Sequence, residues 1–127
     1  LLTKKNEVFG SIYDDNIKII DVRSKNRFLG KEKEPRKELK SGKIPNSKNL
    51  YWKKLVNYDG TIKTNKDLIR LLKKYKLRKN MRIISTCGSG ITACILNLSL
   101  AKLNFYNISV YDGSWAEWGS QKHLPIE

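Results

Sequence analysis

The sequence predicts a single α/β domain built on a central, mostly parallel sheet flanked by helices. Short β-rich runs alternate with segments of helical periodicity, and most of the connecting loops are short. This alternation is typical of parallel sheets whose strands are joined through helices. A length of 127 residues, with 39% hydrophobic and 30% charged residues, suits one globular domain. No apolar run approaches the ~18 residues that span a bilayer, so we expect no membrane segment.

The first half of the chain contains one clear strand and one clear helix. Residues 17–22 form a β-rich run that closes at Asp21. A long polar stretch, residues 23–46, follows, and such stretches inside a compact domain are usually functional. Residues 47–52 could return as a short strand. Asn65 is a plausible N-cap for a helix that runs to about Tyr75 and places its apolar residues on one face.

The second half repeats the strand–helix–strand order. Residues 81–86 predict a buried strand, residues 91–103 a helix, and residues 107–111 a further strand. The turn at Asp112 and Gly113 then leads the chain into residues 114–118.

The net charge of +14 raises the question of nucleic-acid binding. The first 82 residues hold 24 basic and 9 acidic residues, whereas the last 45 hold 2 and 3. The basic residues are 20 Lys and 6 Arg, while surfaces that read nucleic acids favour Arg and aromatic side chains. We therefore interpret the basic residues as a solvated, positively charged surface, and we do not expect nucleic acid as a partner. A basic nucleic-acid-binding domain remains an alternative, ranked behind the two functions discussed below.

The strongest chemical feature is Cys87, which stands between a strand and the start of a helix. In parallel α/β folds, ligands bind beyond the carboxyl ends of the strands. Loop N–H groups and the positive end of a helix favour an anion there, so we expect a reactive thiolate. Gly88 and Gly90 permit a tight loop. The alternative is a buried structural cysteine before a glycine turn.

Residues 87–93, Cys-Gly-Ser-Gly-Ile-Thr-Ala, resemble the active-site loop of rhodanese-fold sulfurtransferases, in the form typical of 3-mercaptopyruvate sulfurtransferases. Further segments that resemble the family follow in order between residues 17 and 127: residues 21–24, Arg27-Phe28 with Gly30, residues 34–36, residues 42–45 and residues 111–118. Two positions depart from the pattern. Lys43 stands where the family has His, and Asn46 stands where it has Gly.

The resemblance implies a rhodanese-like fold for residues 1–127, as the catalytic C-terminal domain of a two-domain protein. It implies that sulfane sulfur moves from 3-mercaptopyruvate, or thiosulfate, through a Cys87 persulfide to a thiol such as reduced thioredoxin or a small thiol, or to cyanide. The preceding rhodanese domain would complete the cleft. No metal and no organic cofactor is implied. The alternative is a non-catalytic rhodanese-like module that carries sulfur or regulates a partner.

The resemblance also assigns roles to individual residues. Cys87 would be the nucleophile, and Ser89 would relay a proton or polarise the substrate carbonyl, or only form loop hydrogen bonds. Arg27 and Arg36 would clamp the substrate carboxylate, which a guanidinium binds in bidentate fashion; two surface arginines are the alternative. The expected substrate-binding set is Arg27, Arg36, Gly88, Gly90, Ile91 and Thr92.

Other residues have structural interpretations. We expect Thr92 to cap the following helix and Cys94 to be a buried, inert thiol. Trp115 and Trp118 should pack against the core, with Glu117 fixing local hydrogen bonds. Asp21 and Arg23 should organise loops, and His123 receives no chemical role.

The loop excludes two kinds of relative. A phosphatase of this fold needs Cys-x5-Arg, but the corresponding residue is Ala93, and Thr86 replaces the His before the cysteine. Gly88 and Ser89 stand where thiosulfate-specialised rhodaneses have basic side chains. The two cysteines, Cys87 and Cys94, are too few for a disulfide scaffold or a zinc site, so we expect a reducing, cytoplasmic compartment.

Overall fold

The computed structural model describes residues 2–127, which form a five-stranded sheet with the order β1-β5-β4-β2-β3. Every pairing is parallel. The strands are β1 (Leu2–Thr3), β2 (Ile17–Asp21), β3 (Lys48–Asn49), β4 (Arg82–Thr86) and β5 (Ile108–Tyr111). The predicted α/β class with a parallel sheet is therefore confirmed.

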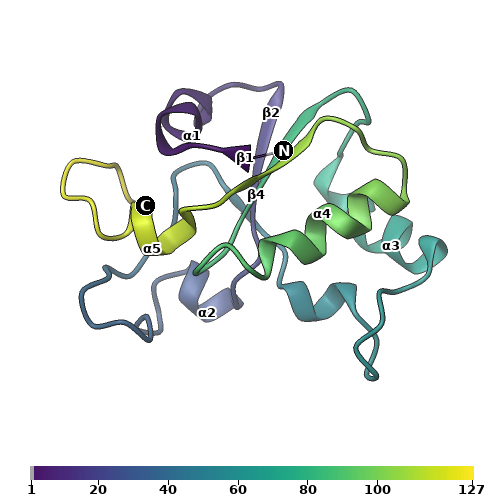
Figure 1. Ribbon diagram of the computed structural model, residues 1–127, viewed down its shortest axis with the longest axis horizontal. Coiled ribbons are helices and arrows are strands. Elements are labelled where there is room, and N and C mark those ends of the chain that lie inside the picture. Colours follow the sequence, from purple (N-terminus) through teal and green to yellow (C-terminus); the bar gives the residue numbers. More distant parts are fainter. Residues whose placement is uncertain (1) are drawn as a thin grey trace.

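Helices cover both faces of the sheet (Figure 1). The α-helices are α1 (Lys5–Ser11), α2 (Lys25–Phe28), α3 (Asn65–Leu72), α4 (Ala93–Lys102) and α5 (Ser114–Trp118). Two short 3₁₀ helices, η1 (Trp52–Leu55) and η2 (Lys73–Tyr75), complete the set. Among residues 2–127, no helix has the length and apolar character that crossing a bilayer requires.

Neighbouring residues of the same strand pack into two separate hydrophobic cores, one on each face of the sheet. Ile20 and Ile83 join one cluster with the inner sides of α3, α4 and η1, while Ile19 and Ile84 join another with α1 and α5. Side chains alternate across a strand, so a strand covered on both faces must be apolar at successive positions. This requirement explains the adjacent apolar pairs Ile19-Ile20 and Ile83-Ile84 within these strands.

The strand and helix predictions hold in position, with corrections at element ends. The predicted strand at 47–52 is only Lys48–Asn49, and Trp52 begins η1. Asn65 is not the N-cap: Thr64 is, and its hydroxyl accepts the N–H of Asp67. The helix ends at Leu72 and tightens into η2.

The amino-terminal strand and helix gave no usable sequence signal. β1 has two residues and depends on pairing with β5, where Leu2 lies opposite Val110. Within the helix α1, Val8 and Ser11 are the buried positions, which is too few for a recognisable apolar stripe. Tertiary contacts therefore define this segment.

The sheet order brings the important loops to one edge. β2 and β4 are adjacent, and Asp21 at the end of β2 lies opposite Thr86 at the end of β4. The segments that follow, Val22–Ser24 and the loop from Cys87, therefore leave the sheet side by side at its carboxyl edge.

Candidate active site

Cys87 lies at the base of the loop after β4, with its side chain almost fully buried. The N–H of Gly90 donates to its Sγ at 2.9 Å. The Ser114 hydroxyl oxygen lies 3.9 Å from Sγ and accepts the Cys87 N–H at 3.0 Å. An N–H donor aimed at sulfur stabilises negative charge that develops there during a reaction, and the Gly90 N–H is placed to do this at Sγ.

Gly90 is required by this arrangement. Its φ is +101°, and a Cβ there would meet the Asp112 carbonyl oxygen at 2.5 Å. Both the backbone angle and the close approach exclude an ordinary side chain. Gly90 thus shapes the loop, and its N–H contacts the Cys87 sulfur.

The short helix α5 holds the Cys87 loop in place through backbone hydrogen bonds. The Trp115 N–H donates to the Cys87 carbonyl at 2.9 Å, and the Ala116 N–H donates to the Gly88 carbonyl at 2.8 Å. Ser114 is buried with φ +50° and bonds both to Cys87 N and to the Tyr111 carbonyl. Ser114 was not predicted as a site residue, although it lies in segment 111–118, which resembles the family.

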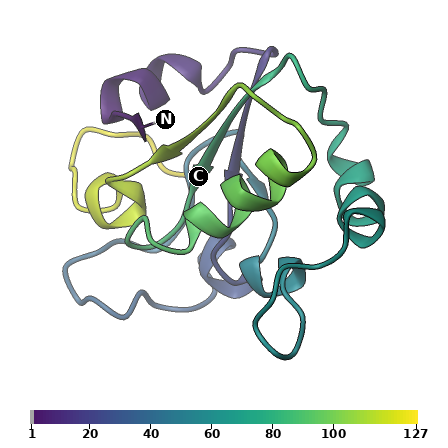
Figure 2. The same cartoon turned by 45° about the vertical axis from the view of Figure 1, so that its right-hand side comes forward.

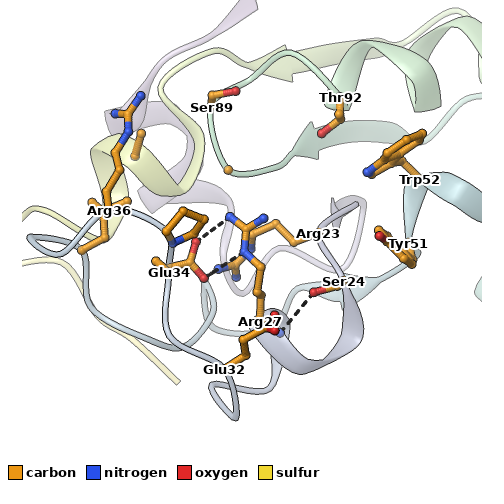
Figure 3. A pocket seen from close by; sticks show the side chains of 14 residues that line it. Arg23, Ser24, Arg27, Glu32, Glu34, Arg36, Tyr51, Trp52, Ser89 and Thr92 are labelled. Atoms are coloured by element: carbon orange, nitrogen blue, oxygen red, sulfur yellow. Dashed lines mark hydrogen bonds and ion pairs between the residues drawn. The ribbon is translucent and has the colours of Figure 1, made fainter.

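A cavity of about 580 Å³ opens above this loop (Figure 3). Ser89 and Thr92 lie along one wall, Tyr51 and Trp52 along a second, and Arg36 stands on the side opposite Trp52. Arg23, Arg27 and Glu34 form the remaining wall. Of the predicted substrate-binding residues, the cavity brings together Arg27, Arg36, Gly88 and Thr92. Ser89, predicted to be catalytic, also lines it, whereas the buried Cys87 at the base of the loop does not.

Two predicted binding residues lie elsewhere. Gly90 is buried behind the loop, and Ile91 is 77% exposed on the outer surface. Neither lines the cavity. Gly90 therefore acts on Cys87 rather than on a cavity occupant, and Ile91 is a surface residue of this chain.

An ion network forms the wall of the cavity that contains Arg23, Arg27 and Glu34. Arg23 pairs with Asp21 at 2.8 Å and with Glu34 at 3.2 Å, and Arg27 pairs with Glu34 at 2.7 Å. The guanidinium of Arg23 also stacks 4.6 Å from the Trp115 ring centroid. Buried charges are tolerated when they are paired in this way, and removing one partner is costly. The predicted loop-organising roles of Asp21 and Arg23 agree with these contacts.

Arg27 is held directly against the loop that follows Cys87. Its Nε and Nη2 both donate to the Glu34 carboxylate, and this hydrogen bonding raises the pKa of Arg27 against the opposing effect of desolvation. A Cβ on Gly88 would lie 2.8 Å from Arg27 Nη2. The missing side chain at position 88 therefore makes room for a fixed positive charge one residue from Cys87.

Arg36 differs from Arg27 in its surroundings. It is exposed, and its guanidinium forms no ion pair or hydrogen bond among residues 2–127. The cavity therefore combines one arginine fixed by Glu34 with one whose donors are all available.

Two structural predictions are wrong. Thr92 stands at the start of α4 with αR geometry and its side chain makes no capping bond; the hydroxyl lies in the cavity wall instead. Cys94 is exposed rather than buried. The apolar neighbours that favoured burial of Cys94 include Leu98, which is itself 60% exposed. The predictions for Trp115, Trp118 and Glu117 are confirmed, since both indoles are buried and Tyr111 donates to Glu117 at 2.6 Å.

Comparison with known proteins places these residues in a family context. The family model for the rhodanese-like domain matches residues 6–121. The chain is 36% identical to 3-mercaptopyruvate sulfurtransferase of Escherichia coli over 126 residues, covering 99% of this chain and 44% of that protein. It is 37% identical to the mitochondrial thiosulfate/3-mercaptopyruvate sulfurtransferase 1 of Arabidopsis thaliana, covering 96% of this chain and 32% of that protein. The chain thus spans less than half the length of these relatives.

Solved structures show the same architecture. Tum1 of Saccharomyces cerevisiae aligns with a TM-score of 0.82 at 29% identity, covering 92% of this chain and 42% of that one. EanB in complex with ergothioneine aligns with a TM-score of 0.91 at 20% identity, covering 99% and 31%. At that lower identity the likeness concerns the fold alone.

Proposed function

This chain belongs to the rhodanese-like domain family, whose matched relatives are sulfurtransferases, and from that premise we propose that it moves sulfane sulfur from 3-mercaptopyruvate through Cys87 to a thiol. The observation that carries the proposal is the placement of Arg27. It is fixed by Glu34 and lies against Gly88, directly beside the loop that buries the Cys87 sulfur.

The first half of the reaction loads sulfur onto the protein. The Cys87 thiolate attacks the sulfur of 3-mercaptopyruvate and forms an S–S bond. The carbon–sulfur bond breaks, its electron pair leaves with pyruvate as the enolate, and a proton converts the enolate to pyruvate. The Gly90 N–H, 2.9 Å from Sγ, supports this proposal because it donates to the sulfur that attacks the donor and then becomes the inner sulfur of the persulfide.

The second half returns the protein to its starting state. A thiolate acceptor attacks the outer sulfur of the persulfide, forms its own persulfide, and releases the Cys87 thiolate. Reduced thioredoxin or a small thiol fits this role, and cyanide would give thiocyanate by the same attack. The cavity of about 580 Å³ is open enough for a donor and an acceptor to enter in turn, as ping-pong kinetics require.

The preference for a carboxylate donor rests on the two arginines. Arg27 offers a fixed guanidinium and Arg36 an unpaired one, and a guanidinium fork matches a carboxylate. Ser89 lies on the cavity wall, where its hydroxyl could polarise the substrate carbonyl. Thiosulfate remains the alternative donor, since the E. coli and Arabidopsis relatives are named for different donor ranges.

We further propose that a preceding rhodanese domain covers the outer side of α4. Apart from Lys102 this helix has no charged residue, and Ile91, Cys94 and Leu98 leave an apolar stripe exposed beside the active-site loop. An exposed apolar patch of this kind commonly marks a contact with another domain or chain. We place the reaction in a reducing, cytoplasmic compartment, because a persulfide carrier needs free thiols.

The test is an intact-mass measurement after 3-mercaptopyruvate is added to the reduced protein. We expect a gain of one sulfur atom, lost again when a thiol is supplied. Cys87→Ser should abolish the gain, and Cys94→Ser is the matched control that should keep it. A gain that persists in Cys87→Ser contradicts the assignment of the nucleophile. No gain with either 3-mercaptopyruvate or thiosulfate, in the isolated chain and in the longer protein, favours the non-catalytic module.

A further inference from the structure

A second hollow lies away from the active site and is lined mostly by lysine. Its volume is about 420 Å³, and Lys18, Lys48, Lys74 and Lys76 surround it together with Asn49 and Tyr75. These residues come from β2, β3 and η2 with its C-cap. No acidic residue lines it. Four like charges therefore face one small volume without a carboxylate among them.

The lysines of this hollow are unpaired. Among residues 2–127 none of the four ammonium groups forms an ion pair, since the five ion pairs of the structure use other cations. The sequence explains the lack of partners, because it contains no Asp or Glu between Asp67 and Asp112. Lys18 is half-buried on a strand flanked on both sides by other strands, so its backbone position is fixed.

The polar neighbours in the hollow are already engaged. The Tyr75 hydroxyl donates to the Asn49 carbonyl, and the Asn49 side-chain amide donates to the carbonyls of Asp21 and Arg23. These groups shape the wall but have few donors left for a ligand. Recognition would therefore depend on the ammonium groups.

Lys76 adds a second, independent observation. Its φ is +53°, a left-handed conformation at the end of η2 that is normally given to glycine or asparagine. A lysine there is held against its backbone preference. Backbone strain of this kind clusters at functional sites.

We propose that this lysine hollow binds a small anion carrying two or more phosphate groups. Ammonium groups are strong point-charge partners for phosphate oxygens, and a volume of about 420 Å³ falls within the range of small-molecule sites. The absence of arginine from the lining and the single aromatic ring favour such a compound over a nucleic acid strand. The hollow is separate from the cavity beside the Cys87 loop, because no residue lines both.

The test titrates inorganic tripolyphosphate into the protein at 150 mM NaCl and follows backbone amide shifts. We expect saturable binding, with the largest shifts at residues 18, 48 and 74–76. Lys74→Gln and Lys48→Gln should each weaken binding at least threefold, and the fourfold Gln variant of the hollow at least 50-fold. Lys18 is half-buried, so its replacement by Gln could disturb folding. Lys18→Met removes the charge but keeps the apolar part of the side chain, and it should weaken binding without a folding defect.

A matched variant separates a site from general attraction. Replacing Lys31, Lys54, Lys66 and Lys122 by Gln removes the same charge from exposed positions outside the hollow and should change affinity less than twofold. Equal weakening by both fourfold variants overturns the proposal. So does the absence of saturable shifts, or a preference for a single-stranded oligonucleotide or for phosphatidylglycerol vesicles over free tripolyphosphate.

Discussion

At the scale of single residues, the proposed donor specificity depends on what is missing at position 88. Gly88 has no Cβ, so the Arg27 guanidinium can lie where a Cβ would come within 2.8 Å of Nη2. A basic side chain at this position would displace the same guanidinium. Because of this steric conflict, the protein can have either Arg27 fixed beside the loop or a basic side chain at position 88, but not both.

We predict that Gly88→Ala lowers kcat/KM for 3-mercaptopyruvate about tenfold, equivalent to about 1.4 kcal/mol, because Arg27 must shift and weaken its bonds to Glu34. The melting temperature should change little, since the colliding atom ends a flexible side chain. Gly10→Ala is the control, because a Cβ there meets nothing within 4 Å. Equal kinetics in both variants would show that the position of Arg27 does not matter.

The two arginines should respond differently to substitution. Arg27→Lys keeps the charge but loses the fork that bonds Glu34 through two nitrogens. We expect kcat/KM for 3-mercaptopyruvate to fall about 10- to 100-fold, because a charge-assisted hydrogen bond is worth about 1.5–3 kcal/mol. Arg36→Lys should cost less, since Arg36 is not fixed by a partner. Arg70→Lys, on the exposed side of α3, is the control. Unchanged kinetics in Arg27→Lys would show that the Arg27 guanidinium does not bind the substrate carboxylate.

At the scale of elements, α5 and the end of β5 hold the Cys87 loop in place. Trp115 and Ala116 donate to loop carbonyls, and the Tyr111 hydroxyl anchors Glu117 at 2.6 Å. A helix of five residues has little stability of its own. Its order therefore depends on these tertiary bonds, and the order of the loop depends on the helix.

This support has a pH dependence. Burial, and the hydrogen bond to Glu117, raise the pKa of Tyr111 above its ordinary value. The neutral phenol is favoured in the fold, so its contribution to stability is complete below about pH 10 and is lost as the pH rises further and unfolded tyrosine ionises. We predict that urea unfolding between pH 9 and 11.5 shows a steeper loss for wild type than for Tyr111→Phe, by at most about 1.4 kcal/mol per pH unit.

The same experiment has an internal control. Tyr58 is fully exposed, so Tyr58→Phe should leave the wild-type slope unchanged. Parallel slopes in wild type and Tyr111→Phe would mean that the phenol does not resist ionisation in the folded protein.

At the scale of the whole molecule, the sequence predicts the sheet and the loop well because both leave local signals. Strands buried on two faces read as apolar runs, and Cys87 with its glycines follows one of them. The ion network could be predicted only in part: Asp21 and Arg23 stood out beside a strand, but nothing local indicates that Glu34 joins Arg23 to Arg27. Ser114 was not predicted because its partner Cys87 lies far from it in the sequence. Cys94 was predicted to be buried because its neighbours are apolar, but it lies on the outward side of α4.

The outward side of α4 also carries the last prediction. Figure 2 shows α4 across the front of the sheet with no other helix of the described chain over it, and Leu98 on it is 60% exposed. In the isolated chain Leu98→Glu should change the free energy of unfolding by no more than about 0.5 kcal/mol, as expected for a surface position. If a preceding domain covers this face, the same substitution in the longer protein places a charge in an apolar contact, which should lower the melting temperature and reduce sulfur transfer.

Lys66→Glu, an exposed change on α3, is the control in both proteins. A Leu98→Glu effect that is equally small in both would place the preceding domain elsewhere, whereas a large loss in the isolated chain would mean that α4 packs more tightly than its exposure indicates.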